Sequence, residues 1–500
     1  MIKLLRLAIL SALFVVQQLS AQPAWIQDSH DFYIRQSMET EHVPGLALAV
    51  IKDGKVVLQR CYGVLEAGKP AMVDSNTLFM IGSNTKAYTA TAVCMLENER
   101  KLSLENKVKK WMPEFRLYDD CVTEMVSIRD LLCHRLGTMT FQGDYTFWGS
   151  DLGRKEVIEK MALLKPPYDF RTRFGYCNAA YMTAGEIIPI VSGLSWEDFI
   201  RKNIFKPLDM NRARALSEEV PDASNMATAH AYYDSKLMPL DHSNIDNLAP
   251  AGSISLSIRD MTHWLLMQMD TGRYHGKQVI PEKVILKTWD ANTIISPRTG
   301  YAYGLGWFIS NQEGKKMLDH TGGVDGFLSA SAFIPELRLG VIVLTNTDNN
   351  VLFTSVRDQL FQLYTGDEFK NLIKSGTVDW ATNQHAEDRR IEIMRDDIQR
   401  MQRLISPNLE MYTGTYSNPV YGTLKVVVEN GKLMVYPSHH PNSPGTLELM
   451  GENKFMCSFK NPTHGIHPMP FTMGEDGKAK SLELKVNNFL EFNTYTFEKI

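Results

Sequence analysis

The feature that most constrains the fold is a change in the spacing of apolar residues along the chain. Near the N-terminus, Asp53-Gly54 lies between two strand-like runs, Gly45–Ile51 and Val56–Leu58, which is typical of a β-hairpin. From Ser83 onward, apolar residues recur at spacings of three and four, which indicates helices. Strand-like runs return late, at 303–309, 330–334 and 339–345. We therefore predict an α+β domain in which segments distant in the sequence share one sheet.

A polar, charged segment separates this pattern from a different one at the C-terminal end. Residues 366–405 carry clustered charges among scattered apolar positions, which predicts a connecting helix. Beyond them, short alternating strands flank Asn430-Gly431 and Asp476-Gly477, two pairs that favour tight hairpin turns. Such strands predict a small antiparallel β-barrel or sandwich. We expect one domain over residues 22–365, a helical linker over 366–405 and a β-barrel over 406–500.

The first residues have the pattern of an export signal. Lys3 and Arg6 precede an apolar run from Leu7 to Val16, and Ala21 offers a cleavage point. We predict a signal peptide over residues 1–21 and a periplasmic or secreted protein. The run is shorter than the roughly 20 residues that span a bilayer, so no stable membrane insertion is expected after signal removal. A retained N-terminal anchor is the alternative.

Composition disfavours several classes of partner. The net charge of −4 and the lack of concentrated Lys and Arg argue against nucleic acid. The six cysteines form no Cys-x-x-Cys pair, and we expect free, buried thiols. His439-His440 and His464–His467 are interpreted as polar surface positions. We predict neither a metal nor a cofactor.

One four-residue segment, Ser83-Asn84-Thr85-Lys86, contains the only Ser-x-x-Lys of the chain. Residues three apart at the start of a helix share one face, so Lys86 can reach the hydroxyl of Ser83. A lysine activates a serine only if its pKa is lowered enough to leave some neutral amine. The plain alternative is a helix-capping serine with a solvated lysine one turn later.

Two later segments decide between these interpretations. Tyr176-Cys177-Asn178 supplies a phenol and an amide, and His320-Thr321-Gly322-Gly323 supplies a polar residue before two glycines. In this order the three segments resemble the serine β-lactamase and penicillin-binding-protein superfamily, closest to its class C β-lactamase, D-alanyl-D-alanine carboxypeptidase and esterase branch. The resemblance covers residues 30–365 and extends to other stretches: 79–82, 128–134, 249–253 and 303–307. The C-terminal region resembles the lipocalin-like barrels appended to some members.

The resemblance implies an antiparallel sheet flanked by helices, a helical subdomain, and a role for each motif residue. Ser83 would attack a carbonyl and become acylated, while Lys86 and Tyr176 would share the proton transfers. For this, adjacent positive charge would have to lower the pKa of Tyr176. Asn178 would hold the lysine or the substrate. The backbone N–H groups of Ser83 and Gly323 would stabilise the oxyanion.

One departure narrows the expected chemistry. The third motif begins with His320, where typical β-lactamases and carboxypeptidases have a lysine that attracts a substrate carboxylate. We therefore predict an exported serine hydrolase that cleaves an amide or ester, with a D-amino-acid-containing peptide or a small ester as substrate. The alternatives are a β-lactamase, a penicillin-binding sensor that acylates but turns over slowly, and a lipid- or sugar-binding barrel attached to an inactive hydrolase.

Overall fold

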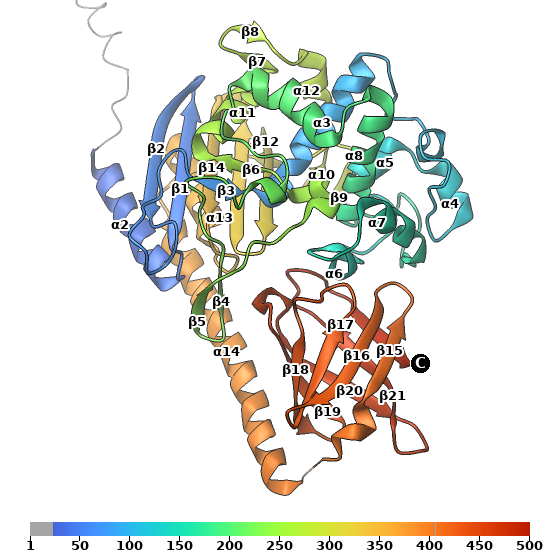
Figure 1. The fold of residues 1–500 in the computed structure, drawn as a ribbon. Coiled ribbons are helices and arrows are strands. Elements are labelled where there is room, and N and C mark those ends of the chain that lie inside the picture. Colours follow the sequence, from blue (N-terminus) through green and yellow to red (C-terminus); the bar gives the residue numbers. More distant parts are fainter. Residues whose placement is uncertain (1–23, 406) are drawn as a thin grey trace, which may run out of the picture.

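The computed structural model describes residues 24–405 and 407–500, and it consists of a large sheet-and-helix unit joined by a long helix to a closed barrel (Figure 1). The predicted signal peptide, residues 1–21, lies outside the described residues. No helix among the described residues is both long and apolar enough to cross a membrane.

An eight-stranded antiparallel sheet organises the larger unit, in the order β2-β1-β14-β13-β12-β11-β10-β9. The N-terminal hairpin is thus completed by the last strand of the unit, with Leu46 paired to Thr345. This confirms that distant segments share one sheet. The strands are β1 (Gly45–Lys52), β2 (Lys55–Gly63), β9 (Thr293–Ser296), β10 (Tyr301–Tyr303), β11 (Phe308–Gln312), β12 (Lys315–Val324), β13 (Phe327–Ile334) and β14 (Leu339–Thr345).

Helices cover both faces of this sheet, which explains why β1 and β14 are nearly continuous apolar runs. Leu48 and Val50 of β1 pack with α2 (Ala24–Thr40) and α13 (Leu352–Thr365) on one face. Ala49 and Ile51 point to the opposite face, where α11 (Ile258–Met269) packs. The side chains of β1 alternate between two cores, and seven of its eight residues are buried.

A group of helices beside the sheet forms the predicted helical subdomain. Its centre is α3 (Thr85–Asn98), which packs against α8 (Asn178–Ser192), α10 (Ala249–Gly252) and α12 (Glu282–Thr288). The helix expected from Ser83 begins two residues later, because Gly82–Asn84 form a 3-10 turn first. Helix α5 (Ile128–Leu132) is short, and shortly after its end His134 adopts a left-handed conformation, with φ of 57°.

The C-terminal strands close into an antiparallel barrel of eight strands. Asn430 and Gly431 both have positive φ, as the tight turn between β16 and β17 requires. Aromatic side chains, among them Tyr416, Phe455 and Phe497, fill its interior. The strands are β15 (Gly414–Asn418), β16 (Gly422–Glu429), β17 (Lys432–Pro437), β18 (Gly445–Gly451), β19 (Lys454–Phe459), β20 (Ile466–Met473), β21 (Ala479–Lys485) and β22 (Thr494–Lys499).

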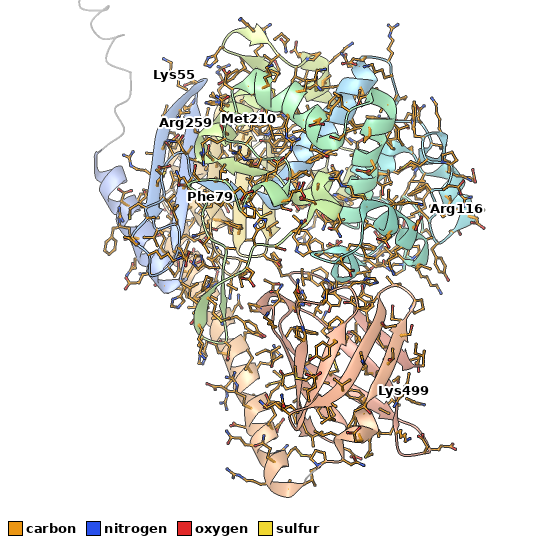
Figure 2. The ribbon with its side chains drawn as sticks, viewed as in Figure 1. Lys55, Phe79, Arg116, Met210, Arg259 and Lys499 are labelled. Carbon is orange, nitrogen blue, oxygen red and sulfur yellow. The ribbon has the colours of Figure 1, made fainter. Side chains whose placement is uncertain are left out.

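Helix α14 (Leu372–Leu404) runs from the larger unit along the barrel (Figure 1). Its residues Ile391, Met394 and Ile398 form a small core with Met450 and Met456 of the barrel. One rim of the barrel meets the larger unit at the short helix α6 (Asp144–Phe147), where the backbone N–H of Gly143 donates to Glu491 of the barrel, and side chains of both units lie along this boundary (Figure 2). The barrel is therefore packed against the unit that carries the Ser-x-x-Lys segment.

Candidate active site

The turn that carries Ser83 is pressed against strand β12. Gly82 has a φ of +51°, and a Cβ atom there would lie 2.7 Å from the backbone nitrogen of Gly323. A Cβ atom on Gly322 would lie 1.9 Å from the carbonyl oxygen of Ile81. Only glycine allows this close approach of two backbones. The two glycines thus bring the first and third motifs together.

Lys86 is completely buried below Ser83, and three oxygen atoms surround its amine. Its Nζ lies 3.0 Å from Ser83 Oγ, 2.6 Å from Asn178 Oδ1 and 2.8 Å from the carbonyl oxygen of Ala251. Burial lowers the pKa of Lys86 to about 7, and the Asp144 carboxyl offsets part of this effect. The predicted contact between Ser83 and Lys86 is present, and the amine can lose its proton near neutral pH.

Asn178 begins helix α8 and orients the lysine. Its Oδ1 accepts from Lys86, and its Nδ2 donates to Asp144 Oδ2 at 2.7 Å. Asp144 lies in α6 and is buried. Burial, together with the nearby carboxylate of Glu491, raises the pKa of Asp144 to about 8. Sequence reasoning missed Asp144 and Glu491, because neither belongs to a motif and the barrel carries one of them.

Tyr176 lies beside the lysine, with Nζ of Lys86 4.6 Å from the centre of its ring. Its hydroxyl is buried, and none of the described residues lies in a position to form a well-aligned hydrogen bond with it. Burial and then Tyr303 raise the pKa of Tyr176 far above its ordinary value, and the Ser83 hydroxyl opposes this only in part. The condition stated for its proton transfers, a pKa lowered by adjacent positive charge, is not met, because desolvation dominates. Tyr176 is therefore a protonated donor.

His320 is held as a neutral side chain in β12. Its Nδ1 lies 2.6 Å from the carbonyl oxygen of Thr321, which can only accept, so Nδ1 carries the proton. Its Nε2 then accepts from the hydroxyl of Tyr303 at 3.1 Å. Burial, followed by the charge of Lys86, lowers the pKa of His320 to about 3. This position supplies no cation for a substrate carboxylate.

A mainly apolar cavity of about 320 Å³ is lined by Ser83, Tyr176, Asn178 and His320 among others. None of the described residues along its wall is Arg or Lys. Two wall residues, Phe489 and Leu490, come from the barrel, and sequence reasoning did not find them. The apolar part of the wall consists of Phe141, Trp148, Phe174, Phe308, Leu328, Phe353, Phe489 and Leu490.

Other candidate residues lie elsewhere. The second Tyr-x-Asn segment, Tyr416–Asn418, belongs to barrel strand β15. His440 and His464 were expected at the surface, and this is wrong: both are buried, and His440 Nε2 lies 2.9 Å from the carbonyl oxygen of Trp148. Packing of the barrel against the larger unit covers them. Burial raises the pKa of the Cys177 thiol to about 12, which argues against a nucleophilic role.

Two family models match the chain. One, described as Beta-lactamase, matches residues 31–364, and the other, a domain of unknown function termed DUF3471, matches residues 402–499. The match to DUF3471 covers the strands of the closed barrel.

Curated relatives share the sequence at moderate identity. The chain is 25% identical to "Unguisins hydrolase ungD'" of Aspergillus campestris, over 89% of this chain and 86% of that protein. It is 27% identical to Protein flp of Staphylococcus aureus (strain COL), over 65% of this chain and 64% of that protein. The second match thus spans less than two thirds of the relative.

Solved structures share the fold. An octameric penicillin-binding protein homologue from Pyrococcus abyssi aligns over 94% of this chain and 99% of its own, with a TM-score of 0.61 and 24% identity. A D-stereospecific amidohydrolase from Streptomyces sp. aligns over 63% of this chain and 94% of its own, with a TM-score of 0.53 and 20% identity. Because the Beta-lactamase family model matches about two thirds of this chain, residues 31–364, the chain belongs to the Beta-lactamase family of serine hydrolases.

Proposed function

We propose that this protein is an exported serine hydrolase that cleaves an amide or ester bond through an acyl-enzyme on Ser83. The substrate class we infer is a D-amino-acid-containing peptide or a small ester with an apolar acyl group. The names of two similar proteins, a hydrolase and a D-stereospecific amidohydrolase, support this class of reaction. The signal-like segment at residues 1–21 supports export.

The observation that carries the proposal is the set of partners around the Lys86 amine. A neutral amine has two N–H donors and one lone pair. Asn178 Oδ1 and the carbonyl oxygen of Ala251 can only accept, so they take the two donors. The lone pair is then left for the third partner, the hydroxyl of Ser83 at 3.0 Å. Neutral Lys86 is thus arranged as the base that activates Ser83.

The remaining residues fit the later proton transfers. As Ser83 Oγ bonds to the substrate carbonyl carbon, its proton passes to Lys86, and the carbonyl oxygen gains negative charge. The Ser83 and Gly323 backbone N–H groups would stabilise that charge. The C–N or C–O bond then breaks, and Tyr176 gives its hydroxyl proton to the leaving group while Lys86 reprotonates the phenol. A water molecule releases the acyl group by the same steps in reverse.

The cavity favours a substrate without a negative charge beside the scissile bond. Its wall is mostly aromatic and aliphatic, and His320 is neutral. A carboxylate placed there would lose its hydration without gaining a cation. We therefore expect substrates without a carboxylate next to the cleaved bond to react faster than substrates that carry a carboxylate there.

The test is a substrate screen with the wild type and a Ser83→Ala variant. The panel contains nitrophenyl esters of increasing chain length, D- and L-aminoacyl amides and a chromogenic cephalosporin. The proposal expects Ser83-dependent turnover of an ester or amide and slow turnover of the cephalosporin. Efficient hydrolysis of the cephalosporin alone would instead establish a β-lactamase. A persistent adduct without turnover would establish a sensor.

A further inference from the structure

One barrel segment, residues 487–493 between β21 and β22, enters the active site of the larger unit. Phe489 and Leu490 line the cavity beside Ser83. The next residue, Glu491, is only 1% exposed. A carboxylate is buried only where several donors compensate its lost hydration. The hydrogen-bond donors around Glu491 therefore show which part of the larger unit it fixes in place.

Four donors surround the Glu491 carboxylate. Oε1 accepts from the backbone N–H of Gly143 at 2.9 Å and from Asn493 Nδ2 at 3.0 Å. Oε2 accepts from the backbone N–H of Tyr145 at 3.1 Å and from the Tyr495 hydroxyl at 2.7 Å. Gly143 and Tyr145 directly flank Asp144 in the sequence. Glu491 thus holds the chain on both sides of Asp144.

Asp144 is linked to the proposed base, Lys86, through the side chain of Asn178. Its Oδ2 accepts from Asn178 Nδ2 at 2.7 Å, and Asn178 Oδ1 accepts from Lys86 at 2.6 Å. We propose that Glu491 is a positioning residue of the active site, acting through Asp144 and Asn178 to keep Lys86 able to accept a proton. This inference rests on the proposed function, in which Lys86 is the base for Ser83.

The hydrogen bonds indicate which of the two neighbouring acids carries the charge. Among the residues that the structure describes, Glu491 accepts four hydrogen bonds, whereas one side-chain hydrogen bond, from Asn178, reaches the Asp144 carboxyl. Two close carboxyl groups cannot both ionise easily, and the charge goes to the better solvated one. Burial raises the pKa of Glu491 as well, but its four hydrogen bonds oppose this effect, so Glu491 is the carboxylate of the pair. Burial together with this charge keeps Asp144 protonated, with its pKa raised to about 8.

A protonated Asp144 leaves the Lys86 ammonium without a counter-ion. Burial lowers the pKa of Lys86, and the groups that raise it when they are ionised are Asp144 and the Cys177 thiol. Two histidines near the amine, His134 and His320, are themselves kept neutral by burial and by the charge of Lys86. If Glu491 loses its charge, Asp144 ionises at lower pH and stabilises the ammonium. Lys86 then keeps its proton to higher pH, and less base is available.

The test is the pH dependence of kcat/KM in a Glu491→Gln variant, measured with the best ester or amide of the screen. In the wild type the acid limb should follow the deprotonation of Lys86, near pH 7. In the variant its midpoint should move up by about one pH unit, the lower end of what a close charge produces. Activity should recover most of its loss above the new midpoint.

A matched control is offered by another acid at the same interface. Asp151 Oδ1 lies 2.8 Å from His439 Nδ1 of the barrel, away from the Lys86 chain. Asp151→Asn is the same change of acid to amide, and it should leave the midpoint unchanged. A merely structural role of Glu491 would lower kcat/KM equally at all pH values. An unshifted midpoint in Glu491→Gln would overturn the inference.

Two further outcomes are distinguished by design. If Glu491→Gln does not fold, Tyr495→Phe removes one donor of the carboxylate and keeps the ring, and a smaller upward shift is expected. An unshifted midpoint in that variant then counts against the inference. If the wild type shows no Ser83-dependent turnover at all, the proposed function fails. Wild-type turnover with an acid limb near pH 7 and no shift in the variants refutes the Glu491 inference alone.

Discussion

Replacing Lys86 by methionine should change how the stability of the protein depends on pH. Burial lowers the pKa of Lys86 from 10.5 to about 7 in the folded chain. Between these values the unfolded chain binds the lysine proton and the folded chain does not. The free energy of unfolding of the wild type therefore increases as the pH rises through this window. The Lys86→Met variant lacks the lysine and so lacks this increase.

The expected magnitude follows from the shift in pKa. Each pH unit well inside the window contributes about 1.4 kcal/mol, but folded Lys86 is still half protonated at pH 7, so the wild type should gain about 2 kcal/mol relative to the variant from pH 7 to pH 9. The substitution also leaves Asn178 Oδ1 and the Ala251 carbonyl without a donor, at about 1–3 kcal/mol each. That loss does not depend on pH over this range. The slope against pH therefore isolates the lysine.

Urea unfolding followed by far-ultraviolet circular dichroism, at several pH values for both proteins, measures this difference. An Asp144→Asn background removes the carboxyl coupled to Lys86 and should leave the sign unchanged. A difference in unfolding free energy that stays constant from pH 7 to pH 9 would refute the reasoning. Such a result would mean that Lys86 titrates at its ordinary pKa and is no base at neutral pH.

Three other substitutions test the site from different sides. Gly322→Ala should lower the free energy of unfolding by about 1–3 kcal/mol in thermal or urea unfolding, because its Cβ would lie 1.9 Å from the Ile81 carbonyl oxygen. Tyr176→Phe should lower kcat about 100-fold without loss of thermal stability, since its buried hydroxyl forms no well-aligned hydrogen bond with any residue in the described part of the chain; unchanged kcat would exclude it as proton donor. Phe489→Ala should shift the kcat/KM preference among nitrophenyl esters toward longer acyl chains, and an unchanged ranking would show that the barrel does not shape the cavity.

Much of the larger unit could be predicted because its signals are local. Asp53-Gly54 specifies a hairpin, and the apolar run of β1 is long enough to show a strand buried on both faces. The order of Ser83, Tyr176 and His320 in the sequence indicated the family. Only the folded chain brings them together, because it places the segments just before α3 and α8 next to β12. Each short motif can be recognised in the sequence because the spacing of its residues reflects one local geometry.

What sequence reasoning missed depends on contacts between the barrel and the larger unit. Phe489 and Glu491 belong to no motif, and their roles follow from where the barrel rim packs. The same packing buries His440, which in sequence resembles a surface loop residue. The direction of the pKa shift of Tyr176 could not be predicted either, because desolvation depends on the whole environment and outweighs one neighbouring charge.

Identification of the acylated residue tests the central claim most directly. The protein is mixed with the best substrate of the screen and quenched with acid within the turnover time, and its peptides are then mapped by mass spectrometry. The account predicts an acyl group on the peptide that contains Ser83 in the wild type, none in Ser83→Ala and far less in Lys86→Met. An acyl group on another residue, or undiminished turnover in Ser83→Ala, would contradict it.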